Sequence, residues 1–346
     1  MNGVARPANA AELAELLRSK SGPVRLRGNG SRADRVPPAA TGTIAIELRN
    51  LATIDRLDAA DFTCSVDAGL DRSTLDDELA ARGVELPCAG AGTLGGLFAS
   101  DPIGATMFGG ASPRSLLLGL EGVLADGTRF RSGARVVKSV AGFDVHRLLV
   151  GSHGTLFAAT RLHLRLRARP RAAAWFRNDA LDEAGARTLF VALRGLAVPP
   201  AALHWRRDAR GHTVAGCIAG RANHVAATMR AHHLREGAPF VDLHLQRTPG
   251  GEVLGGIVLP SRVPALLAAA PPDAPFLVHG GGRFEIGLSS PAESDAFVAA
   301  APRVPCEACI LLGEPARRRR GTPIDPGQSR IAAELKRALD PDGILV

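Results

Sequence analysis

Two glycine-rich loops constrain this chain more than any other feature of its sequence. They are Arg27-Gly-Asn-Gly-Ser31 and Ala89-Gly-Ala-Gly-Thr-Leu-Gly-Gly96, and each follows a short segment of strand character. Because glycine has no side chain, backbone N–H groups in such loops can turn around an anion. A single glycine cluster is more often a plain turn. A third glycine-rich stretch at 137–155 makes a long diphosphate ligand, held along its length, the better interpretation.

Neither loop matches the two most familiar nucleotide-binding patterns. A P-loop needs Gly-Lys-Ser/Thr, and no such run follows either loop. The dinucleotide fingerprint opens a helix within a simple strand–helix–strand unit, and neither loop has that pattern. The glycine loops alone therefore leave the kind of nucleotide open.

Length and composition indicate a globular protein with two domains. The chain has 346 residues, of which 46% are apolar, and it is long for a single hydrophobic core. No uncharged apolar run approaches the ~18 residues that a membrane span requires, and we see no signal-peptide core near the start. We expect a cytoplasmic protein, peripheral to the inner face of a membrane only through partners.

The formal charge of +8 does not predict a nucleic-acid-binding protein. The basic residues are scattered, aromatic residues make up only 4% of the chain and tyrosine is missing, so bases would find few stacking platforms. Lysine occurs only at Lys20, Lys138 and Lys336, which indicates a bias toward arginine rather than a basic face. The run 317–320, four arginines, is either a solvated loop or a partner-docking patch.

The cysteines and histidines do not predict a metal site. Five cysteines are too few and too irregular for a disulfide scaffold, and Cys306-Glu-Ala-Cys309 has no second pair to complete a zinc site. We interpret this CxxC run as a coincidence on a strand edge. None of the ten histidines has an acidic partner at ligand spacing in the sequence, so we expect solvated or core histidines.

Hydrophobic periodicity places the secondary structure in outline. The N-terminal half predicts helices at 9–20 and 73–82, with Ser73 as the cap of the second helix and Asp76 as a capping-box-like acid. Asp126-Gly127 is typical of a hairpin turn. Strands are expected at 24–26, 43–48, 63–68, 116–125, 128–131 and 161–167.

The pattern changes near residue 170, where we place a domain boundary. Beyond it, strand-like and helical stretches alternate, and a similar set then follows, which predicts an antiparallel sheet covered by helices on one face. An amphipathic helix at 328–339 closes the chain. The predicted domains are 1–170, 171–320 and a C-terminal helix at 321–346 that returns to the first domain.

Four runs of residues, in register with one another, resemble the FAD-linked oxidases of the vanillyl-alcohol oxidase (PCMH-type) family. They are Gly92-Thr-Leu-Gly-Gly96, residues 114–127, Val136-Val-Lys-Ser-Val-Ala-Gly-Phe-Asp144 and Leu149-Val-Gly-Ser-His-Gly-Thr-Leu156. Within the family, the chain is most similar to the FAD-binding subunits of bacterial glycolate oxidase, including their closing motif at 339–344. The resemblance covers about 5–168 well and the middle of the chain only in outline.

The resemblance implies an α+β fold, with an FAD-binding domain of two α+β subdomains and a smaller ferredoxin-like cap domain. It also implies FAD as cofactor. Neither glycine loop contains His or Cys, with Cys88 just before the second loop, so we expect the FAD to be non-covalent. The residues that the resemblance places at the cofactor are Arg27, Gly28, Asn29, Gly30, Ser31, Arg32, Gly90, Gly92, Thr93, Leu94, Gly95, Gly96, Ser100, Arg114, Lys138, Val140, Gly142, Asp144, Gly151, Gly154, Thr155 and Ala159.

The cap departs from the family pattern. Relatives that oxidise 2-hydroxy acids often carry His-x-Gly-Asp-Gly-Asn, whereas this chain has His279-Gly-Gly-Gly-Arg283, without the acid and the amide that would bind a metal. Arg283 is a weak candidate for binding a substrate carboxylate through a bidentate fork, with a surface salt bridge as the simpler alternative. The sequence identifies no catalytic base.

Three functions remain open at this point. The first is a flavoprotein subunit of a glycolate oxidase-type complex, which assists oxidation of glycolate or D-lactate to the keto acid beside a related FAD-containing subunit and an iron–sulfur subunit. The second is an autonomous FAD-dependent oxidoreductase that acts on another alcohol or hydroxy acid. The third is a non-catalytic structural subunit with a degenerate FAD fold.

Overall fold

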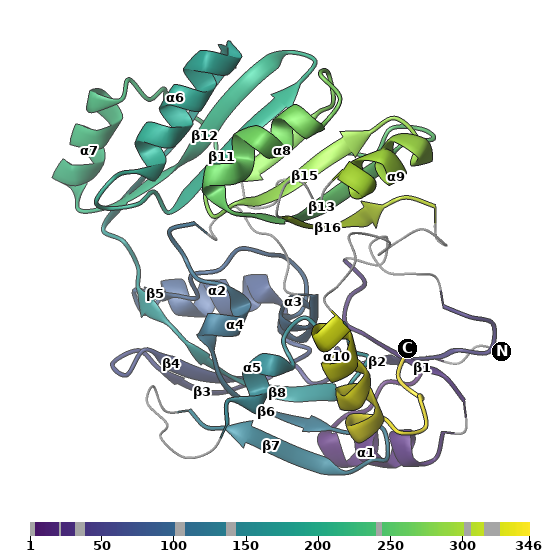
Figure 1. Ribbon diagram of the computed structural model, residues 1–346. Helices are drawn as coiled ribbons and strands as arrows, with labels where there is room; N and C mark the ends of the chain where they lie inside the picture. Colours follow the sequence, from purple (N-terminus) through teal and green to yellow (C-terminus); the bar gives the residue numbers. More distant parts are fainter. Residues whose placement is uncertain are drawn as a thin grey trace.

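The computed structural model has an α+β fold in which two domains lie one against the other (Figure 1). We call residues up to 168 the first domain and residues 172–314 the cap domain. The first domain contains three small or medium sheets, and the cap domain contains one large sheet. The structure describes residues 4–20, 22–31, 39–100, 108–135, 143–239, 244–300, 306–314 and 326–346.

The chain begins with a helix packed on a two-stranded parallel sheet. Helix α1 (Ala10–Arg18) starts at Asn9, whose side chain accepts hydrogen bonds from two backbone N–H groups of the first turn. Its buried Leu13 and Leu17 pack into the same cluster as strand residues of β1 (Val24–Arg27) and β2 (Ile44–Glu47). This small layer forms one wall of the site described below.

The rest of the first domain is built on a five-stranded antiparallel sheet. Its strand order is β3-β4-β8-β6-β7. Along β8, buried and half-buried residues alternate up to Leu164, as a strand with only one fully buried face requires. The predicted hairpin is confirmed, because Gly127 has φ +82 between β6 and β7. The strands are β3 (Ile54–Asp58), β4 (Thr63–Asp67), β6 (Leu117–Val123), β7 (Arg129–Gly133) and β8 (Ala158–Arg165).

Among the described residues of this domain there are also four further helices and a short two-stranded ladder. Leu75 of α2 and Leu97 of α3 are fully buried and pack in one cluster with residues of the sheet. Our sequence prediction missed strand β3, because its polar residues leave no clear hydrophobic alternation. The remaining elements are α2 (Arg72–Ala80), α3 (Leu94–Ser100), α4 (Pro113–Leu116), α5 (Val145–Leu148), β5 (Val84–Glu85) and β9 (Arg167–Ala168).

The start of α2 corrects one sequence prediction. Asp71, not Ser73, is the N-cap residue, and its side chain makes no capping hydrogen bond. Asp76 is not a capping-box acid. It accepts a hydrogen bond from Arg72 Nε at 2.8 Å. The same guanidinium donates to the carbonyls of Leu86 and Cys88 at 2.9 and 2.6 Å, so Arg72 fixes the strand end that leads into the second glycine loop.

Replacing Arg72 by methionine is expected to lower the free energy of unfolding by about 2 kcal/mol, because two buried carbonyls lose their donor. Urea denaturation followed by circular dichroism measures this loss. The matched control is Arg82→Met, since Arg82, just after the other end of α2, makes only exposed hydrogen bonds to the carboxylate and the carbonyl of Glu78, and exposed ion pairs contribute little. Equal stability of the two variants would contradict the role given to Arg72.

The cap domain repeats one arrangement of elements. The second half runs strand–helix–strand–strand–helix–strand, the ferredoxin-like order, and the first half has the same order without the last strand. The two halves join through β11 and β14, so that one seven-stranded antiparallel sheet results, in the order β10-β12-β11-β14-β15-β13-β16. The first half comprises β10 (Ala172–Leu181), α6 (Glu183–Arg194), β11 (Ala202–Asp208), β12 (Gly211–Gly220) and α7 (Ala222–Ala231).

Helices cover one face of the cap sheet, as the sequence predicted. The cluster that joins α6, α8 and α9 to the sheet includes Phe176, Trp205 and Phe284. The other face turns toward the first domain (Figure 1), where a Cβ added to Gly280 would lie 2.5 Å from the Phe108 ring. The second half comprises β13 (Glu252–Val258), η3 (Pro260–Arg262), α8 (Val263–Ala269), β14 (Phe276–His279), β15 (Arg283–Leu288), α9 (Pro291–Ala300) and β16 (Cys306–Leu312).

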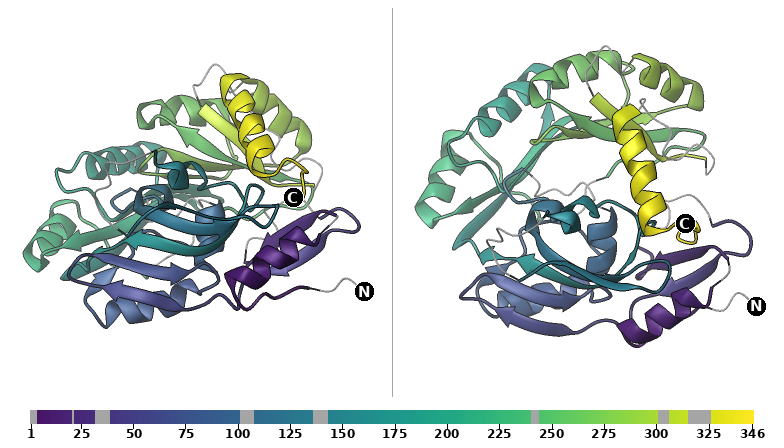
Figure 2. Two further views of the ribbon diagram at one scale, coloured as in Figure 1. Left: turned by 90° about the horizontal axis from the view of Figure 1, so that it is seen from below. Right: turned by 60° about the horizontal axis from the view of Figure 1, so that its bottom comes forward.

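The chain ends beside its beginning. Helix α10 (Pro326–Leu339) runs from the cap side to the first domain, and the residues after it lie next to β1 (Figure 2). Val24 N donates to Ile344 O at 2.7 Å, and Val346 N donates to Val24 O at 2.9 Å. Across the described ranges, no helix is both long and apolar enough to cross a membrane.

Candidate cofactor-binding site

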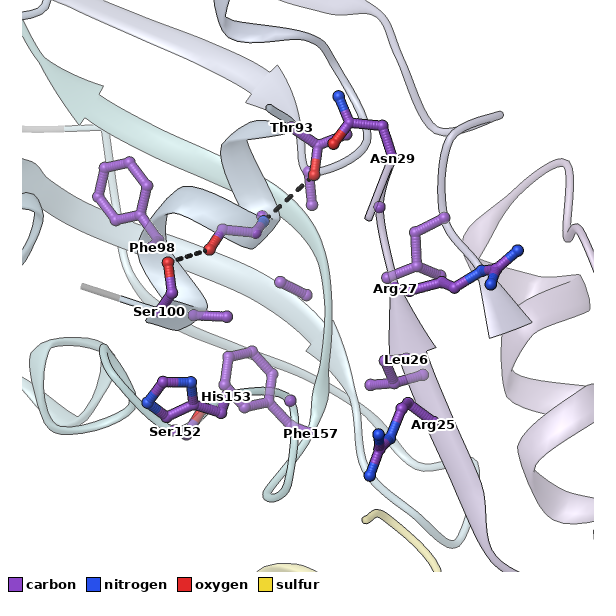
Figure 3. A pocket seen from close by; sticks show the side chains of 18 of the residues that line it. Arg25, Leu26, Arg27, Asn29, Thr93, Phe98, Ser100, Ser152, His153 and Phe157 are labelled. Carbon is purple, nitrogen blue, oxygen red and sulfur yellow. Dashed lines mark hydrogen bonds between the residues drawn. The ribbon is translucent and has the colours of Figure 1, made fainter. Parts of the chain in front are cut away.

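A cavity of about 410 Å³ lies inside the first domain, between its two layers. One wall is β1 with the first glycine loop, and the facing wall is α3 with the segment 149–157 (Figure 3). The sheet residues Leu117, Leu120 and Leu162 form the floor. Segments that lie far apart in the sequence thus meet around one cavity.

The glycines bring the two walls close together at one end of the cavity. A Cβ on Gly28 would lie 2.1 Å from Thr93 Oγ1, and one on Gly92 would lie 2.4 Å from Ser31 Oγ. Gly30 and Gly92 have φ values of +75 and +89, which other residues rarely adopt. The two loops predicted from the sequence therefore touch, and only glycine fits where they do.

Not every residue of the second loop is available to a ligand. The N–H groups of Leu94 and Gly95 already donate to the carbonyls of Leu70 and Ala68 at 2.9 and 2.6 Å. A Cβ on Gly95 would lie 2.8 Å from Ala68 O, so this glycine allows α3 to pack against the neighbouring chain. These two residues shape the loop, and the first loop carries more of the surface that an anion could contact.

Hydrogen bonds within the walls fix their shape. The Asn29 side chain donates to Asp71 at 2.9 Å, which ties the first loop to the start of α2. Gly96 N donates to Thr93 Oγ1 at 3.3 Å, and Ser100 Oγ donates to Gly96 O at 2.7 Å. Figure 3 shows the last two bonds along α3. The loop end of the cavity is therefore largely pre-formed, as ligand sites usually are.

The lining away from the glycine loops is mostly apolar, with Ser152 and His153 beside Phe157 (Figure 3). Leu26, Phe98 and Phe157 belong to it together with the floor leucines, and Phe157 is held edge-on to Phe130 with ring centroids 5.6 Å apart. An apolar slot of this kind suits a flat aromatic ring system, because it excludes water from both ring faces. Ala159, also in the lining, leaves room that a larger side chain would fill.

Charge at the cavity comes from β1. Arg25 and Arg27 both line it, and Arg27 forms an ion pair with the buried carboxylate of Glu47 on β2. Arg6 donates to the same carboxylate at 2.6 Å. Hydrogen bonds from Arg6 and then Arg27 hold the pKa of Glu47 below its ordinary value, so Glu47 stays ionised and fixes Arg27 at the cavity edge.

The structure brings together half of the residues named from the sequence. Two further residues act behind the lining: Arg114 donates to the carbonyls of Arg147 and Val150 at 2.7 and 2.9 Å, and Gly151 N donates to Phe98 O at 3.1 Å. Asp144 is exposed and pairs with Arg147.

The residues that line the cavity are Arg27, Gly28, Asn29, Gly30, Ser31, Thr93, Gly95, Gly96, Ser100, Gly154 and Ala159. Those described but outside the lining are Gly90, Gly92, Leu94, Arg114, Asp144, Gly151 and Thr155. Arg32, Lys138, Val140 and Gly142 lie outside the described residues, as does the arginine run 317–320.

Sequence reasoning missed several lining residues. Ser152 and His153 lie between Gly151 and Gly154, which the sequence analysis had named. The backbone of His153 is left-handed, with φ +54, which is typical of a constrained turn. Strand alternation could have indicated Arg25 beside Arg27. Ala45 and Leu48 come from the neighbouring strand β2 and its end, and no local signal places them here.

The catalytic candidate Arg283 does not lie in the cavity lining. It is on β15, paired with Ile257. Two described histidines do have acidic partners far away in the sequence. His244 Nδ1 lies 2.5 Å from Oε1 of Glu285 on β15, and His163 Nε2 lies 3.9 Å from Glu121 Oε1 in the first domain. Among the described residues, no group of three His, Cys, Asp or Glu side chains is placed to hold a metal. Cys306 and Cys309 lie on β16, the edge strand of the sheet.

The histidines of the cap sheet are core residues. His204 and His279 lie opposite each other on β11 and β14 and are almost fully buried. Desolvation lowers the pKa of His279 to about 4 and that of His204 well below its ordinary value. Both rings are therefore neutral near pH 7. Neither lies in the cavity lining.

Comparison with known proteins agrees with this geometry. Residues 1–133 match the family described as FAD binding domain. The chain is 30% identical over 169 residues to a D-lactate dehydrogenase of Archaeoglobus fulgidus, which covers 47% of this chain and 38% of that protein. It is 30% identical over 168 residues to glycolate oxidase subunit GlcE of Escherichia coli, which covers 47% of each chain.

These matches are partial, since the chain spans less than half the length of either relative. A solved structure of alkyldihydroxyacetonephosphate synthase superposes with a TM-score of 0.72 at 14% identity and covers 99% of this chain and 75% of that one. At this identity the likeness concerns the fold, and it includes the cap domain as well as the first domain.

Proposed function

We propose that this chain, whose residues 1–133 match an FAD binding domain, is the FAD-binding subunit of a glycolate oxidase-type complex. Its role there is to assist the oxidation of a 2-hydroxy acid, glycolate or D-lactate, to the 2-keto acid. The observation that carries the proposal is the cavity in which both glycine loops meet at one end of an apolar slot.

The residues present fit an FAD molecule. The diphosphate would lie against Gly28, Asn29, Gly30 and Ser31, where the chain leaves close backbone access and where Arg27 is held by Glu47. The flavin ring would lie in the apolar end, near Phe157 and Ala159. Of the described lining residues, none is a cysteine, and His153 is the only histidine. We therefore keep the expectation of non-covalent binding.

When bound, FAD supplies the acceptor for the hydride that leaves the hydroxyl-bearing carbon. This chain binds the cofactor at its loop end, orients it through the fixed walls, and excludes water with its apolar floor. His153 also belongs to the described lining, and its side chain is exposed.

We further propose that the principal substrate site of the complex lies on a related FAD-containing subunit, with an iron–sulfur subunit as the next electron carrier. Arg283 and the cap histidines lie outside the cavity lining. This favours a role for the chain in assembly or electron relay over a substrate site of its own. The match to a glycolate oxidase subunit also favours this assignment over an enzyme that acts alone.

The test compares the isolated chain with the chain purified alongside its partners. We expect the isolated chain to carry flavin that glycolate and D-lactate bleach slowly or not at all under anaerobic conditions, and the complex to be bleached rapidly. Rapid bleaching of the isolated chain would instead favour the autonomous oxidoreductase. A chain that takes up no flavin would leave only the structural subunit.

A further inference from the structure

The C-terminal segment forms part of the cavity's framework. Through its hydrogen bonds with Val24, the segment 344–346 adds a short parallel bridge to the free edge of β1. The other edge of β1 pairs with β2. Because β1 carries Arg25, Leu26 and Arg27 of the lining, the segment 344–346 supports that wall along its edge.

One lysine of α10 connects this wall to the opposite one. Lys336 Nζ donates to Leu345 O at 2.7 Å, in the C-terminal segment, and to Thr155 O at 2.7 Å. Thr155 closes the turn whose residues Ser152, His153 and Gly154 line the far side of the cavity. The ammonium group of Lys336 is therefore hydrogen-bonded to both sides of the cavity, although these two walls are far apart in the sequence.

The third contact of Lys336 balances its charge. Its ammonium donates to the carboxylate of Asp340, one turn later on the chain and 1% exposed. The two Asp340 oxygens also accept from Ile344 N at 2.9 Å and from Leu345 N at 2.8 Å. Asp340 thus folds the C-terminal segment back toward α10, and Lys336 fastens the folded segment to the turn at Thr155.

This arrangement needs lysine. An ammonium presents three donors around one atom, whereas a guanidinium presents its donors in a planar fork. In Lys336 the three acceptors converge on the single Nζ atom, which an arginine could not reproduce. The chain has only three lysines among 42 basic residues, and one of them stands at this position.

We propose that Lys336 is a positioning residue for the cofactor, which sets the separation of the β1 wall and the Ser152–Gly154 turn. This proposal rests on the proposed function, in that it takes the cavity to bind FAD. It implies that FAD binding and ordering of the C-terminal segment are coupled, so that each stabilises the other.

The test uses Lys336→Met, which keeps the apolar stem, and Lys336→Arg, which keeps the charge, in the full chain. We expect both to weaken FAD binding about tenfold or more, because charge-assisted hydrogen bonds at the wall are lost. The visible band of bound flavin should also lose its vibrational shoulders at saturating FAD, since the ring environment becomes less ordered. A purely structural lysine would lower only the unfolding midpoint of the FAD-free chain.

Arg337→Met is the matched control, because Arg337 is the next residue of α10 and is exposed. It removes a positive charge from the same helix and should leave both the affinity for FAD and the flavin spectrum unchanged. Unchanged FAD binding and an unchanged spectrum in both Lys336 variants would overturn the proposal, provided that the wild-type chain binds FAD. Failure of the wild-type chain to bind FAD would instead overturn the proposed function.

A second measurement uses only the wild-type chain, so its result does not depend on whether the Lys336 variants fold. Hydrogen exchange of the wild-type chain should slow on addition of FAD at the amides of 344–346, although no residue of that segment lines the cavity. The turn 151–155 should be protected in parallel. Protection of the turn without protection of 344–346 would contradict the coupling.

Discussion

The Gly28→Val chain is expected to bind FAD about 100-fold more weakly than the wild-type chain, since forced overpacking of this kind costs about 3 kcal/mol. A Cβ on Gly28 would lie within 3.0 Å of three side-chain atoms of Thr93. Valine would therefore push the first loop away from the second, where the diphosphate should lie. Titration of the apo chain with FAD, followed by flavin fluorescence, measures the change.

Gly22→Val serves as the control for this variant. Gly22 precedes the same strand, and a Cβ added to it would meet no atom within 4 Å. We expect its FAD affinity to equal that of the wild type. If Gly28→Val bound FAD as tightly as Gly22→Val, the contact between the two glycine loops would not be part of the cofactor site.

The second large effect concerns acid stability of the cap domain. Burial lowers the pKa of His279 from its ordinary 6.5 to about 4, and neither ring nitrogen has a hydrogen-bond partner among the described residues. Between these two pH values the unfolded chain binds a proton that the folded chain does not. The free energy of unfolding should therefore fall as the pH drops from 6.5 to 4, by up to about 3 kcal/mol for this residue.

His279→Leu removes the titrating group from the cap core and should flatten this pH dependence. His204 has a pKa shifted in the same direction, so part of the slope should remain. Urea midpoints at several pH values give the measurement, and His224→Leu on α7, a half-buried position, is the control. If His279→Leu kept the full wild-type slope, His279 would not be the neutral core residue described above.

The two glycine loops of the first domain could be predicted from the sequence because their signals are local. Glycines at Gly28, Gly30 and Gly92 are required by close approach or by positive φ, and such requirements appear directly in a sequence. The cap repeat was also visible, since alternation of strands and helices leaves a periodic pattern. Ser73 was misplaced as a cap because Ser and Asp are both good N-cap residues, and Asp71 precedes it.

The remaining features depend on contacts between distant residues. Arg27 was expected at the cofactor, but its pairing with Glu47 depends on the parallel register of β1 and β2. His244 and Glu285 are 41 residues apart, so spacing could not reveal the pair. Lys336 was only a rare residue in the sequence, and its three acceptors belong to Asp340 just after α10, to Leu345 and to a turn 181 residues earlier.

The most direct test of the account is the amount of FAD that the purified full chain binds. An equilibrium titration, read by the visible flavin spectrum, should saturate at one FAD per chain, and the flavin should be released when the protein is denatured. Absence of flavin bands after incubation with excess FAD would contradict the assignment of the cavity between β1 and α3 as the cofactor site.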